Sequence, residues 1–365
     1  MRIIITSPSL DPTKNVSGLS SVTRFIIENN PHQDYVHFEL GRKDGEKGGI
    51  HRVNAVIRRF QDWKRLLKTY PDAIVHYNFP LEKPSIIRDT PFMRAALQNG
   101  NQMVIHIHGG FYLTSESIPS PFRQMLNYVF SWNVPFITLS ETEAETLRKR
   151  FHAKHVVSLP NCIDLKDAQT FQRKYKDVST PLTLGYLGRI AKTKGMDDLL
   201  QACYMLKERH IPFRFQIAGA EELEGQYLPQ FSKLLGNQFA YAGIVSGESK
   251  NAFLQSLDVL TMPTFFEGLP MSLLECMSYG VVPVITPVGS IPTVVKDQQN
   301  GILVKVKDAQ SIVDAIANLH THRDRLEQMG KSSRNYIYQH FDSDSYIDKL
   351  NNIYSTCSCH SNSKR

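Results

Sequence analysis

The chain has 365 residues, of which 41% are hydrophobic and 21% charged. This is more than one ordinary hydrophobic core serves, and it suits two globular domains. The formal net charge is +7, and segment 42–68 alone holds nine basic and three acidic residues. A local patch of this kind argues against general nucleic-acid binding.

The five cysteines are scattered along the chain, which is typical of a protein from a reducing compartment. The apolar run at the start is only three isoleucines, too short for a signal peptide. No segment approaches the roughly 20 apolar residues of a membrane-spanning helix. We therefore expect a cytoplasmic protein.

Short apolar runs alternate with helical patterns along both halves, which predicts parallel strands buried on both faces. The expected strands of the first half are 2–6, 74–77, 103–108, 136–139 and 156–159, and its expected helices are 19–28, 53–69, 121–131 and 141–150. The expected strands of the second half are 182–187, 213–218, 239–241, 258–262, 282–286 and 301–304. Segment 161–181 lacks the apolar pattern, and we interpret it as a linker. The pattern indicates two doubly wound α/β sheets.

A glycine loop follows the first strand of the second half. It runs from Gly188 to Gly195, carries Arg189 and Lys194, and leads into a helix near Met196. Two cations beside a helix N-terminus can hold a diphosphate, although a solvated basic turn is equally consistent. The spacing is neither that of a Walker A loop nor that of the G-x-G-x-x-G dinucleotide fingerprint.

Segment 265–275, FFEGLPMSLLE, lies between two apolar strands. Pro270 suits the first position of a helix, and Gly280 suits a left-handed cap at its end. Glu267 would then lie on a loop at the positive end of the helix, and Glu275 on the helix itself. Carboxylates at strand ends could bind sugar and ribose hydroxyls. The alternative is a dipole-favoured glutamate followed by a solvated one.

Three weaker signals lie in the first half. Segment 53–67 predicts an amphipathic helix with Ile57 on its apolar face. Its basic rim is either solvated or in contact with an anionic membrane surface. We expect His106 and His108 on opposite faces of their strand, with His108 toward the ligand crevice. Gly18, just before a helix, could let the backbone approach an anion, or mark a plain turn.

Together these segments resemble the retaining, nucleotide-sugar-dependent glycosyltransferases of family 4, which have the GT-B fold. GRIAKTKG at 188–195 and the pair Glu267 and Glu275 carry the resemblance. HIHGG at 106–110, Gly18 and LPNCID at 159–164 are consistent with it. The residue before Gly18 is Ser17, where many members have a second glycine.

The resemblance implies a fold and a domain organisation. The fold would be two doubly wound Rossmann-like domains facing a central cleft, with a C-terminal helix crossing back to the first domain. The acceptor-side domain would comprise residues 1–165 with 345–365, and the nucleotide-sugar-binding domain residues 166–344.

The resemblance also implies site residues. The catalytic set would be Glu267, His108, Arg189 and Lys194. The donor-binding set would be Gly18, Arg189, Lys194, Gly243, Ile244, Glu267, Gly268, Leu269, Pro270, Met271 and Glu275. No metal site and no cofactor are expected, since the family commonly needs no divalent metal.

The resemblance assigns a role in donor binding or catalysis to each of these residues. Arg189 and Lys194 would bind the diphosphate and stabilise the departing nucleotide. Glu275 would hold the ribose and Glu267 the transferred sugar. His108 would contact that sugar from the other domain, Gly18 would approach the diphosphate, and 243–244 would border the base.

The implied activity is transfer of a hexose or N-acetylhexosamine from a nucleotide sugar, with UDP-sugar favoured, to a glycan hydroxyl with retention. Lipid-linked acceptors of surface polysaccharide biosynthesis, such as lipopolysaccharide O-antigen, are included. An anionic membrane surface is a further partner through segment 42–68, and it would place the protein peripherally on the inner face of the plasma membrane. The alternatives are a nucleotide-sugar epimerase and a non-catalytic sugar-nucleotide-binding scaffold.

Overall fold

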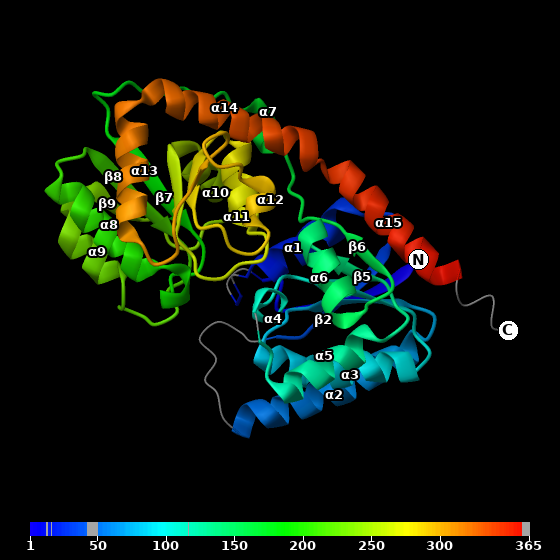
Figure 1. Cartoon of the computed structure of the whole chain (residues 1–365). Coiled ribbons are helices and arrows are strands. Elements are labelled where there is room, and N and C mark those ends of the chain that lie inside the picture. Colours follow the sequence, from blue (N-terminus) through cyan, green and yellow to red (C-terminus); the bar gives the residue numbers. More distant parts are fainter. Residues whose placement is uncertain (12–13, 16, 42–49, 116, 360–365) are drawn as a thin grey trace. The chain divides into compact units, whose positions relative to one another are not determined.

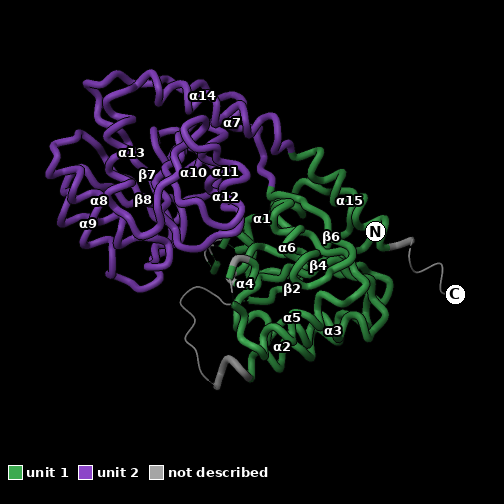
Figure 2. The backbone as a smooth tube through the Cα atoms, viewed as in Figure 1, with its two compact units in different colours: residues 1–161, 343–365 green, residues 162–342 purple. Residues whose placement is uncertain are grey.

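The computed structural model describes residues 1–365 except 12–13, 16, 42–49, 116 and 360–365. The chain divides into two compact units (Figure 2). The first unit contains Met1–Asn161 with Ser343–Arg365, and the second contains Cys162–Asp342. The boundaries expected from the sequence, 165/166 and 344/345, lie within four residues of this division.

The first unit is built on a six-stranded parallel sheet with strand order β2-β1-β3-β4-β5-β6. Figure 1 labels β2, β5 and β6 of this sheet. Its strands are β1 (Arg2–Ser7), β2 (Asp34–Glu39), β3 (Ile74–Phe79), β4 (Met103–Ile107), β5 (Phe136–Thr138) and β6 (Val156–Ser158). Its helices are α1 (Gly18–Asn29), α2 (Ile50–Thr69), α3 (Lys83–Gln98), α4 (Phe111–Thr114), α5 (Ser120–Phe130), α6 (Glu141–Phe151) and α15 (Ser343–Cys359).

The second unit repeats this architecture with strand order β12-β11-β10-β7-β8-β9. Its strands are β7 (Leu182–Leu187), β8 (Phe213–Ala218), β9 (Phe239–Tyr241), β10 (Val259–Met262), β11 (Val282–Ile285) and β12 (Ile302–Leu303). Its helices are α7 (Lys166–Thr170), α8 (Met196–Glu208), α9 (Leu228–Leu235), α10 (Gly247–Ser256), α11 (Met271–Ser278), α12 (Ile291–Val294), α13 (Ala309–Thr321) and α14 (Arg323–His340), with 3-10 turns η1 (Lys192–Lys194) and η2 (Gly236–Gln238).

The strand order of the second sheet reverses between β7 and β10. From β7 the chain proceeds outward through β8 and β9, and from β10 it proceeds the other way through β11 and β12. Such a reversal opens a crevice beyond the carboxyl ends of the two central strands, where ligands of doubly wound sheets bind. The prediction of two doubly wound sheets is confirmed.

The elements of the first unit that were not predicted from the sequence include β2 and α3. β2 pairs only with β1 at the sheet edge and is mostly half-exposed, so its apolar residues form no continuous run. α3 carries Pro91 inside the helix, which interrupts the pattern by which a helix is recognised. Both elements depend on neighbours for their stability rather than on a strong local pattern.

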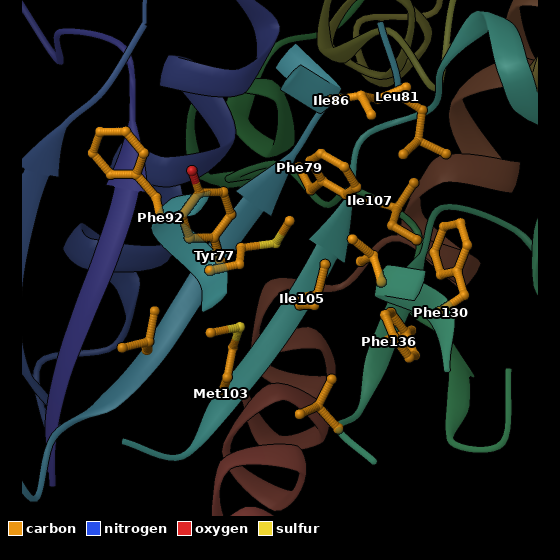
Figure 3. Packing of buried hydrophobic residues seen from close by; sticks show 14 of the residues in the cluster. Tyr77, Phe79, Leu81, Ile86, Phe92, Met103, Ile105, Ile107, Phe130 and Phe136 are labelled. Carbon is orange, nitrogen blue, oxygen red and sulfur yellow. The ribbon is translucent and has the colours of Figure 1, made fainter. Parts of the chain in front are cut away.

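Buried aromatic and aliphatic side chains fill the first unit. Figure 3 shows Tyr77 and Phe79 of β3 beside Ile105 and Ile107 of β4. Helix α2 closes this core with Trp63, whose Nε1 donates to Phe92 O at 2.9 Å.

The expectation that Ile57 belongs to the apolar face of α2 was wrong, because its side chain is 52% exposed. It lies about a quarter turn from the centre of the buried stripe, at 100° per residue.

The C-terminal helix α15 returns to the first unit, as predicted. Asn351 of α15 exchanges hydrogen bonds with Asn30, at 2.9 Å and 3.2 Å. Across the described residues, each helix is too short or too polar to cross a membrane.

Arg173, in the segment 161–181 that was expected to be a linker, forms hydrogen bonds to the second unit. Its guanidinium donates to Tyr279 O at 2.6 Å, Leu257 O at 2.5 Å and Leu254 O at 3.3 Å. These carbonyls lie at the C-terminal ends of α10 and α11, where a cation is favoured by the helix dipoles. Burial lowers the pKa of Arg173 from its usual value. The periodicity of apolar residues gives no information about a charged residue with this role, so Arg173 could not be predicted from it.

Replacing Arg173 by Met should lower the free energy of unfolding of the second unit by about 3 kcal/mol or more, because three buried carbonyls lose a charged donor. Urea unfolding followed by circular dichroism measures the change. Lys174→Met, at the neighbouring exposed position, is the matched control. Equal midpoints for the two variants would contradict the anchoring role.

Candidate functional site

The glycine loop 188–195 and the segment after β10 meet backbone to backbone. Gly195 has φ +77°, and a Cβ there would lie 2.0 Å from Pro263 O. Phe265 N donates to Thr193 O at 3.0 Å. The turn η1 then leads into α8, which begins at Met196 as predicted. The two segments therefore form one structure at the carboxyl ends of β7 and β10.

Lys194 and Glu267 form an ion pair across this junction. Lys194 Nζ donates to Glu267 Oε1 and to Phe266 O, the latter at 3.3 Å. The two side chains are 24% and 21% exposed, so both are held yet accessible to a ligand. A cation and a carboxylate that the sequence predicted separately thus belong to one site.

Tyr186, a residue of β7, lies close to Arg189 and Glu267. Its hydroxyl donates to Arg189 O at 2.7 Å, which holds the loop that carries Arg189. Burial raises the pKa of Tyr186 well above its usual value, the charge of Glu267 raises it further, and Arg189 opposes the change. Tyr186 was missed by the sequence analysis, because a tyrosine in an apolar strand resembles any core residue.

The segment 268–271 is held between the ion pair and α11. Gly268 O accepts from Ser290 N at 2.9 Å. Gly289 has φ +56°, and a Cβ there would lie 2.0 Å from Glu267 O. Pro270, expected at the first helical position, is instead the N-cap residue, and α11 begins one residue later at Met271.

The expected end of α11 is confirmed, since Gly280 follows the helix with φ +72°. Leu269, also in the predicted donor set, is buried beside Pro270.

Glu275 projects from α11 to a partner that the sequence analysis did not identify. Lys250 Nζ of α10 donates to Glu275 Oε1 at 2.7 Å. The side chains are 32% and 18% exposed. The sequence alone does not distinguish a lysine that pairs with a glutamate of another helix from a lysine that is exposed to solvent.

The loops after β8 and β9 lie at the same edge. Gly219 N donates to Gly243 O at 2.8 Å, and Tyr241 Oη donates to Gly219 O at 2.8 Å. Ile244 is 47% exposed. The predicted base-bordering pair therefore shares the carboxyl edge of the second sheet with the two main motifs.

The remaining predicted residues, Gly18 and His108, belong to the first unit. Gly18 is the first residue of α1, and the N-cap Ser17 accepts from Ser20 N at 3.2 Å. A Cβ on Gly18 would meet nothing within 4 Å, so the fold itself does not require glycine there. The predicted contacts of Gly18 and His108 with a donor stay predictions.

The expectation that His106 and His108 face opposite ways was wrong. Their ring centroids lie 4.0 Å apart, because residues two apart along an extended chain share a face. Asn78 Nδ2 donates to Thr6 O at 2.6 Å, which turns its Oδ1 toward His108 Nε2 at 2.7 Å. His108 therefore carries its proton on Nε2. Burial lowers its pKa to about 3, so the ring is neutral at pH 7.

A third histidine extends this cluster to the C-terminal helix. His76 Nε2 lies 3.2 Å from His106 Nδ1, and His76 Nδ1 lies 2.6 Å from Tyr354 Oη of α15. Burial lowers the pKa of His76 to about 3. Burial also lowers the pKa of His106 well below its usual value, with smaller effects of charge at His108 and His76.

The buried histidines should make the first unit acid-sensitive. Between pH 6.5 and about 3 the unfolded chain binds a proton at His76 that the folded chain does not. Stability therefore falls as the pH drops through this window, by about 2 kcal/mol for His76 at pH 5.

Urea unfolding of the first unit at pH 7 and pH 5 tests this, and His76→Gln should reduce the difference by that amount. The exposed His32→Gln should match wild type. A pH difference that is unchanged in His76→Gln would contradict the assignment.

Among the described residues, no group of three or more His, Cys, Asp or Glu side chains is arranged to hold a metal ion. The prediction that the site works without a metal stays a prediction.

Residues 167–336 match the family model of the glycosyl transferases group 1. The putative colanic acid biosynthesis glycosyltransferase WcaL of Escherichia coli is 27% identical over 177 residues, which are 46% of this chain and 44% of the relative. The chain thus spans about half the length of the curated relatives it matches.

Solved structures match nearly the whole chain. Sucrose-phosphate synthase from Thermosynechococcus elongatus has a TM-score of 0.77 at 16% identity and covers 98% of this chain and 99% of its own. Anabaena HepE in complex with UDP-glucose has a TM-score of 0.72 at 14% identity, with coverages of 98% and 100%. This likeness is one of fold.

The family match covers the part of the chain that carries both motifs, the glycine loop after β7 and the segment that joins β10 to α11. The predicted GT-B fold class is confirmed by the two parallel six-stranded sheets and the returning C-terminal helix. The second unit therefore matches the group 1 glycosyl transferases over residues 167–336, which are just under half of the chain.

Proposed function

We propose that this protein is a retaining glycosyltransferase that takes a hexose or N-acetylhexosamine from a nucleotide sugar, with a UDP-sugar as the first choice. The observation that carries the proposal is the ion pair of Lys194 and Glu267 at the point where the strand order reverses. It brings a diphosphate-binding cation and a sugar-binding carboxylate into one site.

The residues of the site suit this division of labour. An ammonium group has three donors, and Lys194 uses two of them on Glu267 and Phe266, which leaves one for a phosphate oxygen. Transfer breaks the bond from the anomeric carbon to the diphosphate oxygen and forms a bond to the acceptor oxygen on the same face. The proton of the acceptor hydroxyl passes to the departing diphosphate. Negative charge grows on the departing diphosphate, where Arg189 and Lys194 would stabilise it.

Glu275 takes the ribose in this proposal, and residues 243–244 border the base. Glu267 orients the transferred sugar through its hydroxyls while Lys194 fixes the carboxylate. No metal is needed, because two cations and the start of α8 supply the positive field.

For the acceptor we propose a glycan hydroxyl of surface polysaccharide biosynthesis, lipid-linked glycans and O-antigen precursors included. WcaL of Escherichia coli is named for a putative role in colanic acid biosynthesis, and Anabaena HepE was solved with UDP-glucose. These names support the acceptor and donor classes at the level of relatives.

UDP should stabilise the protein in the absence of metal, whereas GDP and ADP should act weakly. A ligand at about 100 times its Kd adds about 2.7 kcal/mol, which a thermal scan with EDTA detects. Glu275→Gln should lose this stabilisation, and Glu248→Gln, at an exposed position of α10, should keep it.

Product analysis separates the rivals. Release of UDP that depends on an added glycan acceptor supports transfer, and conversion of the free UDP-sugar into its epimer would support an epimerase. Binding with neither reaction would support a scaffold. Absence of stabilisation by all three nucleotides would refute the proposal.

We also propose that α2 contacts an anionic membrane surface. Arg59 pairs with Glu39 at 3.1 Å and Arg65 with Asp62 at 2.6 Å. Arg58, Lys64 and Lys68 are exposed along the helix, and Ile57 is exposed beside Arg58. Exposed cations next to an apolar side chain suit an anionic bilayer. Residues 42–49 of the predicted basic segment lie outside the described residues.

The triple variant Arg58→Gln, Lys64→Gln and Lys68→Gln should bind phosphatidylglycerol vesicles at least tenfold more weakly than wild type, at about 1 kcal/mol per cation. Vesicle sedimentation at low salt measures the binding. The control neutralises three exposed cations of the second unit, Arg214, Lys233 and Lys305. An equal loss of vesicle binding in both variants would show a general effect of net charge and would contradict the proposed membrane contact of α2.

A further inference from the structure

We propose that Lys250 is a positioning residue that orients the Glu275 carboxylate toward the ribose hydroxyls of the donor. The inference rests on the proposed function, because it assumes that Glu275 binds a ribose. It adds a residue that neither the motifs nor the family resemblance assigns.

The contact is short and shielded. Lys250 Nζ lies 2.7 Å from Glu275 Oε1, and the side chains are 32% and 18% exposed. Partly buried ion pairs lose less to solvent screening than exposed ones. Because Lys250 binds Oε1, the carboxylate is fixed in rotation and presents Oε2 to a ligand. The two neighbouring hydroxyls of a ribose are donors that suit such an oxygen.

The position of Lys250 is unfavourable for its own helix. Ser246 is the N-cap of α10, so Lys250 lies four residues into the helix, close to the positive end of the dipole. Cations are destabilising there, and anions are favoured. Glu275 supplies that anion from another helix. A residue that breaks a local rule is expected where a site is built.

The two helices are also held together at their other ends. The Arg173 guanidinium binds Leu254 O and Leu257 O at the end of α10 and Tyr279 O at the end of α11. α10 and α11 therefore cannot slide apart without breaking these bonds. This frame gives the ammonium of Lys250 a defined distance to Glu275, which a positioning role requires.

The test compares nucleoside diphosphates with their 2′,3′-dideoxy analogues. UDP, GDP and ADP are titrated calorimetrically, and the tightest binder of wild type is paired with its dideoxy form. Lys250→Met should weaken the ribose form about tenfold, the size of one lost charged hydrogen bond. It should leave the dideoxy form unchanged, because that form has no hydroxyls for Glu275. Lys250→Arg should recover part of the loss.

Three further variants serve as controls. Like Lys250→Met, Glu275→Gln should weaken binding of the ribose form and leave binding of the dideoxy form unchanged. The double variant with Lys250→Met should bind the ribose form only slightly more weakly than Glu275→Gln alone, because the two side chains act as one unit. Lys233→Met, at an exposed position of α9, controls for charge. Circular dichroism establishes that each variant is folded.

The outcomes distinguish this inference from the function beneath it. Equal weakening of the ribose and dideoxy forms by Lys250→Met would show a purely structural role and overturn the inference. The inference alone also fails if Glu275→Gln loses ribose-dependent binding while Lys250→Met does not. Failure of wild type to bind any of the three diphosphates would overturn both the inference and the proposed function.

Discussion

The close approach of two backbones at the centre of the second sheet governs the candidate site. Gly195 lies so near Pro263 that a Cβ would fall 2.0 Å from the proline carbonyl. That proximity lets Thr193 O accept from Phe265 N and brings Lys194 to Glu267. The site is thus a consequence of parallel strands whose carboxyl ends meet where the strand order reverses. Any side chain at 195 would separate the cation from the carboxylate.

In both units, buried charged and polar side chains form hydrogen bonds that connect one element to another. Arg173 joins the ends of α10 and α11, and Tyr186 holds the loop of Arg189 from below. In the first unit, His76 joins the β-sheet to Tyr354 of the returning helix. A buried polar group is costly unless it is paired, so each of these contacts selects one arrangement of its elements. Rigid elements held in this way can keep a site in register.

Much of the fold could be predicted from local patterns, and the exceptions have physical causes. The strands from 182 to 262 were found almost to the residue, since buried parallel strands read as continuous apolar runs. β2 was missed because an edge strand needs no such run, and α3 because Pro91 interrupts its pattern. Ile57 was misplaced at the margin of its helical stripe. The histidine pair was misread by a wrong application of strand alternation.

The sequence by itself determined that two parallel sheets form and that both motifs follow strands of the second sheet. Strand length, apolar period and short connections are local properties, and right-handed crossovers leave little choice of topology. Only the tertiary structure decided which side chains meet. Lys250 and Glu275 are 25 residues apart, and Arg173 and Tyr279 are 106 apart. Such pairs depend on how whole helices pack against one another, and no local periodicity encodes that packing.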